Sequence, residues 1–364
     1  MERMKTVLAL NSGSSSLKFG VYRVSPGQID TLLSGEASAL GSPQSSFSAS
    51  GIDTETLTDS SVSGVMKRLE SLLANAGLPA LDAVGHRVVH GGAQLCQPCL
   101  INDDVLAQLA HASVFAPLHT PAALEAIKTA RAHFPQLPQV ACFDTGFHAG
   151  LPPVAQVLPL PRELRAQGVR RYGFHGLSCE SIVRQLGASL PRRVVIAHLG
   201  NGASVTAVLE GKSIDTSMGL TPSGGMVMGT RSGDLDPGVL IYLMREHQMD
   251  AATLEQLIDH KSGLLGISGL ASDMRKLHEA AGQNPDARLA IDMFCQGARK
   301  QIAAMVAVLE GLDLLVFTGG IGEHDEAIRE QICAGLQWLG LADKVRTLPS
   351  LEDEQIAHWT AIKS

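Results

Sequence analysis

Short apolar runs, separated by small or polar residues, mark the first part of the chain. Residues 7–10 and 17–24 are strand-like runs that flank the small, hydroxyl-rich residues 11–16. This pattern predicts a β-hairpin with a polar tip, because a turn of small residues joins two runs of strand-forming residues. Apolar runs at 84–89 and 140–143 predict two more buried strands. Apolar residues at helical spacing predict helices over residues 62–76, 103–112 and 122–133.

The second half repeats the opening pattern. Residues 194–197 and 205–209 are strand-like runs around the small-residue turn 200–204, about half the chain away from the first hairpin. The repeat predicts a duplicated architecture with a cleft between the halves. Residues 38–61, rich in Ser, Thr and Gly, predict surface loops and weak strands, and the prolines between 152 and 161 predict the boundary between halves.

The remainder of the second half is mostly helical. Apolar spacing predicts helices over residues 239–247, 252–260, 273–281 and 288–309. A strand at 312–318 then leads into the glycine-rich turn 319–322, and a single helix is predicted over 323–338. Acidic residues occupy the first turn of that helix, where the helix dipole favours negative charge.

Composition narrows the class of protein. The 364 residues are 45% hydrophobic and 18% charged, which excludes a disordered or fibrous chain. The net charge of −7 argues against binding to nucleic acid or an anionic membrane, since both attract clustered positive charge. No apolar stretch is long enough for a transmembrane helix, and the first residues do not resemble a signal peptide, so a cytoplasmic protein is expected.

The cysteines do not indicate a disulfide framework or a zinc site. Cys96 and Cys99 have the CxxC spacing, but the chain has no second CxxC pair. Reduced thiols, mostly buried, are therefore expected for the six cysteines.

Three turns of small residues, at 11–16, 200–204 and 319–322, each follow a predicted buried strand. Glycine lets backbone N–H groups approach an anion closely, and successive N–H groups can form a nest for phosphate oxygens. A P-loop is excluded, since Gly211-Lys212-Ser213 follows Thr206 where that motif needs its first glycine, and no GxGxxG motif occurs. The three turns favour a phosphate-binding protein of another kind.

Nine segments in order along the chain resemble the acetokinase family, within the actin-like, sugar-kinase-like ATPase superfamily. They are residues 11–18, 85–92, 116–119, 143–145, 171–176, 198–204, 228–237, 272–275 and 317–323. The resemblance implies an α/β, two-lobed, duplicated ββαβαα fold of the ribonuclease H-like (actin-like ATPase) type, with the active site in a cleft between the lobes. It places residues 1–148 and a C-terminal helix at about 353–364 in the first lobe and residues 149–352 in a nucleotide-binding lobe. It also implies a homodimer.

The family's reaction is reversible, Mg²⁺-dependent, in-line phosphoryl transfer: ATP + acetate gives ADP + acetyl phosphate. A carboxylate nucleophile is already ionised at neutral pH, so the main obstacle is the approach of two anions. Positive charge and hydrogen-bond donors should therefore carry the catalysis. The resemblance assigns this work to Arg87 and Arg231, which bracket the carboxylate and the phosphoryl group, to His175 as a donor, and to Asp144 as the residue that orients them.

The resemblance also assigns binding residues. Nucleotide and phosphate contacts fall on Ser14, Ser16, Lys18, His198, Leu199, Gly200, Asn201, Gly202, Asp273, Met274, Arg275, Gly319, Gly320, Ile321 and Gly322. Asn11 and Glu352 are the expected ligands of Mg²⁺, or of Mn²⁺, although Leu351 stands where the family has Asn. His86 and His90 lie on a predicted strand and are interpreted as structural.

The acetate pocket is assigned to Val89, Leu118, His119, Phe174 and Pro222. Valine at position 89 narrows this pocket, so acetate should be preferred to propionate by the modest factor that one methylene allows. Three alternatives stay open: a propionate or butyrate kinase of the same family, an ATP-binding switch without transfer activity, and a sugar kinase. The arginine and histidine set argues against the second, and the apolar pocket argues against the third.

Overall fold

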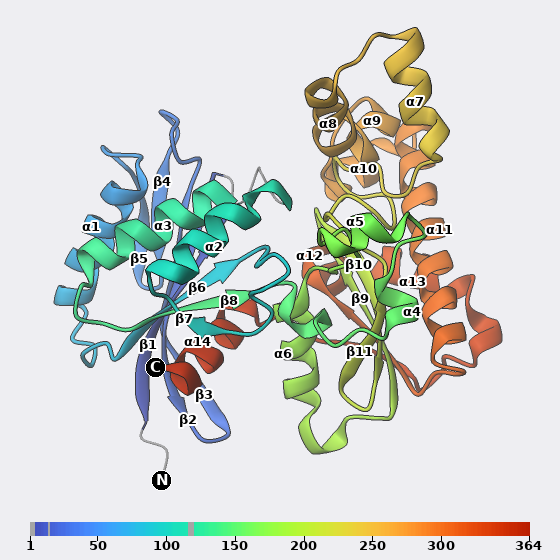
Figure 1. The fold of residues 1–364 in the computed structure, drawn as a ribbon. Coiled ribbons are helices and arrows are strands. Elements are labelled where there is room, and N and C mark those ends of the chain that lie inside the picture. The colour runs from blue at the N-terminus through green and yellow to red at the C-terminus, as the bar shows by residue number, and fades with distance from the viewer. Residues whose placement is uncertain (1–3, 14, 116–119) are drawn as a thin grey trace. The chain divides into compact units, whose positions relative to one another are not determined.

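The computed structural model describes residues 4–13, 15–115 and 120–364, which form two compact units (Figure 1). The N-terminal unit consists of Met1–Ala149, Gly176–Ser181 and Leu351–Ser364, and the C-terminal unit consists of Gly150–His175 and Ile182–Ser350. Each unit is built around its own β-sheet. The chain is therefore α/β with a sheet in each half, as its sequence predicts.

The N-terminal unit contains a mixed eight-stranded sheet in the order β5-β4-β3-β2-β1-β6-β8-β7. The predicted hairpin is present: β1 and β2 are antiparallel, and Asn11 pairs with Lys18 at its tip. Strands β6 and β8 extend the sheet in the parallel direction from β1. The strands are β1 (Lys5–Ser12), β2 (Leu17–Ser25), β3 (Gln28–Ser38), β4 (Ser46–Ala49), β5 (Ile52–Thr56), β6 (Ala83–Val88), β7 (Cys99–Leu100) and β8 (Gln139–Phe143).

Helices cover both faces of this sheet, because alternate residues of β1 point to opposite sides. Leu8 and Leu10 pack in a core with α1 (Val62–Asn75) and α3 (Thr120–His133). Val7 and Ala9 pack on the other face against α14 (Glu352–Lys363). Figure 1 shows α14 on the side of the sheet opposite to α1 and α3. The unit also contains α2 (Asp103–Ala112), the 3₁₀ turns Ser113–Phe115 and Gly146–His148, and the start of α6 (Gly176–Leu186).

The C-terminal unit repeats the central arrangement with a sheet in the order β11-β10-β9-β12-β13. Strand β9 pairs antiparallel with β10 and parallel with β12, as β1 pairs with β2 and β6. This common pattern confirms the predicted duplication. The strands are β9 (Arg193–Leu199), β10 (Ala203–Leu209), β11 (Lys212–Thr216), β12 (Leu314–Thr318) and β13 (Val345–Thr347).

Helices make up most of the rest of the C-terminal unit. They are α4 (Pro153–Gln156), α5 (Arg162–Ala166), α7 (Pro237–Glu246), α8 (Ala251–His260), α9 (Gly263–Ser268), α10 (Met274–Ala280), α11 (Pro285–Val308), α12 (Gly319–His324) and α13 (Glu326–Ala334), with 3₁₀ turns at Gly187–Ser189 and Gln337–Leu339. None of the helices that the structure describes is long and apolar enough to cross a membrane.

The predicted turn at 319–322 and single helix over 323–338 are wrong. Helix α12 already begins at Gly319, and the chain leaves helical geometry at Asp325. The carboxylate of Asp325 accepts a hydrogen bond from the backbone N–H of Ile328 and caps the start of α13. Aspartate favours this capping geometry, so an acidic residue that was interpreted as part of one helix instead separates two.

His86 is a buried histidine of β6, and it makes the stability of the N-terminal unit depend on pH. Its Nε2 lies 2.7 Å from Oε1 of Gln139, and burial lowers its pKa to about 4. The unfolded chain binds this proton near pH 6.5, whereas the folded chain does not until about pH 4. The contribution of His86 to the free energy of unfolding is therefore fully present above pH 6.5. It decreases as the pH falls, by up to ~3 kcal/mol near pH 4.

Urea unfolding at pH 7.5, 6, 5 and 4.5 measures this dependence. We expect His86→Gln to flatten the loss of stability below pH 6.5, while His111→Gln, which removes an exposed histidine of α2, keeps the original slope. Equal slopes for the two variants would contradict the assignment.

Candidate active site

The ends of β1, β6 and β8 place three of the predicted site residues side by side in the N-terminal unit. Arg87 on β6 forms an ion pair with Asp144, which directly follows β8: Nη2 lies 2.6 Å and Nε 2.9 Å from Oδ2. Nη1 of Arg87 also donates to Oδ1 of Asn11, at 3.3 Å. The side chain of Asp144 is only 1% exposed, so its negative charge depends on the guanidinium next to it.

Acidic residues at the start of α14 complete this group. Burial opposes the charge on Arg87, but Asp144, Glu352 and Asp353 outweigh that effect and raise the pKa of the guanidinium above its usual range. Oδ1 of Asp353 also accepts a hydrogen bond from Nδ2 of Asn11, at 2.8 Å. Asp353 is not among the residues predicted from the sequence, although its place beside Glu352 in the first turn of a helix is a usable signal.

Only part of the predicted acetate pocket lies among the described residues of the N-terminal unit. Val89 is buried directly after β6. Leu118 and His119, like Ser14 of the predicted phosphate set, lie outside the described residues. His86 and His90 have internal partners: His86 is bonded to Gln139, and Nδ1 of His90 accepts from the backbone N–H of Gly92.

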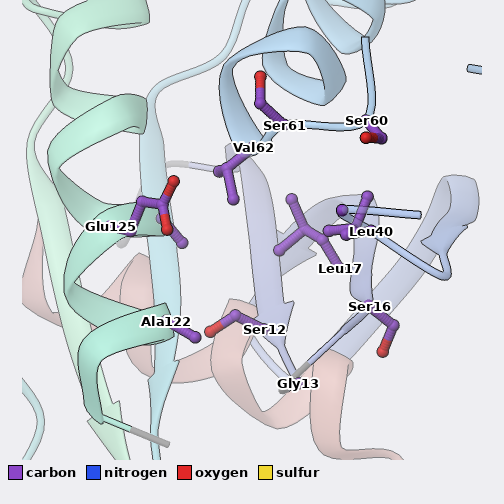
Figure 2. Close-up of a pocket in the computed structure, with 12 residues that line it drawn as sticks. Ser12, Gly13, Ser16, Leu17, Leu40, Ser60, Ser61, Val62, Ala122 and Glu125 are labelled. Carbon is purple, nitrogen blue, oxygen red and sulfur yellow. The ribbon is translucent and has the colours of Figure 1, made fainter. Parts of the chain in front are cut away.

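Ser16 lines a small pocket of the N-terminal unit, with a volume of about 240 Å³, and Lys18 is exposed on β2. Figure 2 shows the apolar side chains of Leu17, Leu40 and Val62 between the β1–β2 hairpin and the start of α1, with Glu125 projecting from α3. The hairpin tip is thus hollowed on one side. Its lining consists of Ser12, Gly13, Ser16, Leu17, Leu40, Gly41, Ser60, Ser61, Val62, Ala122, Glu125 and Ala126.

In the C-terminal unit, His175 and Arg231 meet at Gly202. A Cβ atom built on Gly202 would lie 3.2 Å from Nε2 of His175 and 3.3 Å from Nη1 of Arg231. The same Nη1 donates to the backbone carbonyl of Pro222, at 3.3 Å. A ring nitrogen and a guanidinium therefore point at one small space that the missing side chain leaves open, which is a geometry suited to an anion.

His175 is held in an unusual backbone conformation. Its φ and ψ are 58° and 26°, in the left-handed region, directly before α6. Such strain in a residue other than glycine is concentrated at functional sites. The ring stacks on His198 with centroids 4.1 Å apart, and Phe174 before it is fully buried.

A larger pocket of the C-terminal unit, about 1050 Å³, contains seven of the predicted nucleotide residues. Asp273 caps α10 and is paired with the exposed Arg275, at 2.6 Å. Gly200 and Gly320 approach each other closely, since a Cβ on Gly200 would lie 3.8 Å from the backbone nitrogen of Gly320. The pocket is lined by Gly200, Asn201, Ser272, Asp273, Met274, Arg275, His278, Gly320, Ile321, His324, Asp325 and Glu326.

The other predicted nucleotide residues of the C-terminal unit lie outside this lining. Leu199 is buried at the end of β9, and Gly319 begins α12 with a φ of 77° that favours glycine. Gly322 is buried in the same short helix. The pocket also contains residues that the sequence did not predict: His278, whose Nε2 lies 2.9 Å from Oδ2 of Asp325, and the acidic and histidine residues at 324–326.

Filling the space at Gly202 should disable the site without unfolding it. We expect Gly202→Ala to lower kcat/KM about 10²-fold or more, because the new methyl group occupies the position at which both donors point. The backbone of Gly202 has ordinary φ, so thermal stability should change little. Steady-state kinetics and a thermal melt check both statements, with Gly282→Ala as the control, since a Cβ at Gly282 meets nothing within 4 Å. Full activity in Gly202→Ala would rule out an anion site there.

Comparison with known proteins identifies the family. The family model of the acetokinase family matches residues 6–358. An acetate kinase from Rhodopseudomonas palustris (strain ATCC BAA-98 / CGA009) is 44% identical over 349 residues, which is 92% of this chain and 87% of the relative. An acetate kinase from Thermosynechococcus vestitus is 40% identical and covers 98% of this chain and 93% of its own.

Solved structures agree in fold. A propionate kinase from Francisella tularensis has a TM-score of 0.93 at 36% identity, over 99% of this chain and 100% of its own. An acetate kinase from Porphyromonas gingivalis has a TM-score of 0.88 at 34% identity, over 98% and 99%. Fold, site and relatives together define the chain as a phosphotransferase with the actin-like type of α/β fold. It belongs to the acetokinase family.

Proposed function

We propose that the chain catalyses reversible phosphoryl transfer between ATP and acetate. A carboxylate oxygen of acetate attacks the γ-phosphorus, the bond from that phosphorus to the β–γ bridging oxygen breaks, and ADP leaves with that oxygen. The observation that carries this proposal is the convergence of His175 and Arg231 on Gly202, next in sequence to the Gly200 and Asn201 of the larger pocket. Positioning and charge stabilisation are the main needs of phosphoryl transfer, and these residues can supply both.

The residues at Gly202 and the residues around Arg87 would have different roles in this reaction. We propose that Arg231 and His175 donate to the oxygens of the transferred phosphoryl group, and that the larger pocket of the C-terminal unit holds the nucleotide. Arg87, held by Asp144, would bind the carboxylate of acetate and offset its negative charge.

Asn11 and Glu352 fit the proposed metal. Mg²⁺ takes oxygen ligands and is usually held by one or two carboxylates with waters and substrate phosphates. No cluster of three or more His, Cys, Asp or Glu suited to a metal occurs among residues 4–13, 15–115 and 120–364. The amide oxygen of Asn11 and the carboxylate of Glu352 belong to one acidic group around Arg87, and hard oxygen donors of this kind suit Mg²⁺ or Mn²⁺. When bound, the ion supplies positive charge to the phosphates.

A hydroxamate assay tests the proposed reaction directly. Purified protein is incubated with ATP, Mg²⁺ and hydroxylamine, and with acetate, propionate or butyrate in separate reactions. We expect acyl hydroxamate to form with each acid that the protein accepts as a substrate, and to form fastest with acetate. A higher rate with propionate would favour the activity of the Francisella tularensis relative. No hydroxamate with any acid, from protein shown to bind ATP, would contradict the proposal.

Val89 should limit the length of the acid. We expect Val89→Ala to raise kcat/KM for propionate relative to acetate about tenfold, because the loss of two methyl groups makes room for one methylene. The control is Val88→Ala, since Val88 packs in the core with Leu95 and Leu109 and should affect stability rather than selectivity. An unchanged ratio in Val89→Ala would place the alkyl group of the substrate elsewhere.

We also propose a cytoplasmic homodimer. Exposed apolar side chains on α7 support the dimer: Ile241 is 46% and Tyr242 57% exposed, and none of the residues of α7 is buried. A helix with apolar residues on all sides is normally covered. Light scattering of the purified protein gives the oligomeric state, and Tyr242→Glu should shift it towards the monomer.

A further inference from the structure

Ser204 is a buried serine directly beside the ring of His175. Its Oγ lies 2.9 Å from Nδ1 of His175, on the side of the ring away from Gly202. Ser204 is fully buried on β10, where it pairs with His198 of β9. The hydroxyl therefore occupies a fixed place in the sheet, and it contacts the one ring nitrogen that does not face Gly202.

A neutral imidazole carries a proton on one nitrogen and a lone pair on the other. In the proposed reaction, Nε2 of His175 must donate to a phosphoryl oxygen at Gly202, so Nε2 must carry the proton. Nδ1 is then an acceptor and needs a donor next to it. A serine hydroxyl can donate, and it is the group that the structure places there.

We propose that Ser204 is a positioning residue that fixes the tautomer of His175. The Oγ–H of Ser204 donates to Nδ1, and this keeps the proton of the neutral ring on Nε2, directed at Gly202. His175 can then act as a donor at neutral pH without becoming positively charged. The inference rests on the proposed function, since that function requires a donor at Nε2.

The surroundings of the ring favour a neutral donor. His198 stacks on one face of His175, and Nη1 of Arg231 approaches the same point at Gly202. His198 belongs to β9, and Arg231 lies in the segment before α7. A positive charge on His175 would be repelled by Arg231, whereas a neutral ring with its proton on Nε2 adds a second donor at no such cost.

Three variants of the full-length protein separate this role from simple packing. Ser204→Ala removes the hydroxyl, Ser204→Thr keeps a hydroxyl on the same strand, and Thr206→Val is the matched control. Thr206 is also fully buried on β10, and its Oγ1 lies 2.9 Å from Oγ1 of Thr216 on the neighbouring strand. Loss of a buried hydroxyl should therefore lower stability in both Ser204→Ala and Thr206→Val.

The tautomer itself is the first readout. Protein labelled with ¹⁵N-histidine gives ring-nitrogen shifts that distinguish the two neutral forms, and His175→Gln identifies the signals of His175. We expect the Nε2–H form in the original protein, in Thr206→Val and in Ser204→Thr, and a mixture of both forms in Ser204→Ala. An Nδ1–H form in the original protein at pH 7.5, with ADP present, would overturn the proposal.

The pH profile of kcat is the second readout. At pH 8 we expect Ser204→Ala to lower kcat about two- to fivefold, in proportion to the fraction of His175 that leaves the Nε2–H form, and Ser204→Thr to regain most of it. The loss of kcat in Ser204→Ala should be smaller at acid pH, because the doubly protonated ring carries a proton on Nε2 whatever lies beside Nδ1. A loss in Ser204→Ala that is equal at pH 6 and pH 8, or equal to that of Thr206→Val, would overturn the proposal. Failure of the original protein to form hydroxamate would instead contradict the proposed function, and the tautomer measurement would still stand.

Discussion

Arg231→Ala should lower kcat by about 10³-fold or more while the KM for ATP changes little. Arginines that contact a transferring phosphoryl group contribute about 10³–10⁵ in rate in other phosphotransferases. Arg231 is placed for that role, because its Nη1 points at the space beside Gly202 and is held there by the carbonyl of Pro222. An interaction that forms mainly in the transition state affects kcat rather than substrate binding. Initial rates over a matrix of ATP and acetate concentrations measure both constants.

Arg275→Ala is the matched control for this prediction. Arg275 is also an arginine of the C-terminal unit, but its side chain is 87% exposed in the larger pocket of that unit, where it pairs with Asp273. We expect its loss to raise the KM for ATP and to leave kcat nearly unchanged. Arg231→Lys should recover only part of the rate, since an ammonium group does not present the planar pair of donors of a guanidinium. If Arg231→Ala raised the KM for ATP and kept kcat, Arg231 would be a binding residue of the ground state.

Much of the fold could be predicted from local pattern. Helix α2 was predicted with the bounds that the structure has, because Asn102 caps it and its apolar residues have clear helical spacing. The two hairpins were predicted from turns of small residues between apolar runs. Strand β3 was not predicted, because its burial pattern alternates poorly and only Leu33 and Ala37 of its eleven residues are buried. Its strand geometry comes from its pairing with β2, which no local pattern records.

The predicted site residues illustrate the same limit. The family resemblance implied that Asp144 orients Arg87, and the two residues do pair, since β6 and β8 are neighbouring parallel strands. Spacing alone did not reveal Asp353 or Ser204. Asp353 reaches Asn11 from the other end of the chain, and Ser204 reaches His175 from a neighbouring strand. Contacts of this range require the assembled sheet, so the sequence predicted the residue types of the site better than their partners.

Arg87→Met should destabilise the N-terminal unit by ~3 kcal/mol or more and abolish detectable transfer. The loss of Arg87 leaves the carboxylate of Asp144, which is 1% exposed, without the guanidinium that compensates its charge. Removal of one partner from a buried ion pair strongly destabilises a protein, because the other charge stays buried. The double variant Arg87→Met/Asp144→Leu removes both charges and should recover most of the stability, because apolar groups of similar size can replace a buried pair. Activity should not return with it, since the acetate carboxylate would still have no cation to bind.

Urea unfolding and the hydroxamate assay, applied to the original protein, Arg87→Met, the double variant and Arg193→Met, separate these two effects. The pair Arg193–Asp313 is the control, since its side chains are about a third exposed and solvent already screens the charges. We expect Arg193→Met to lose far less stability than Arg87→Met and to keep its activity. If the double variant stayed as unstable as Arg87→Met, loss of packing rather than an uncompensated charge would explain the single variant. If the double variant transferred phosphoryl groups at the original rate, the ion pair would be a structural element, and the carboxylate of acetate would bind to another cation.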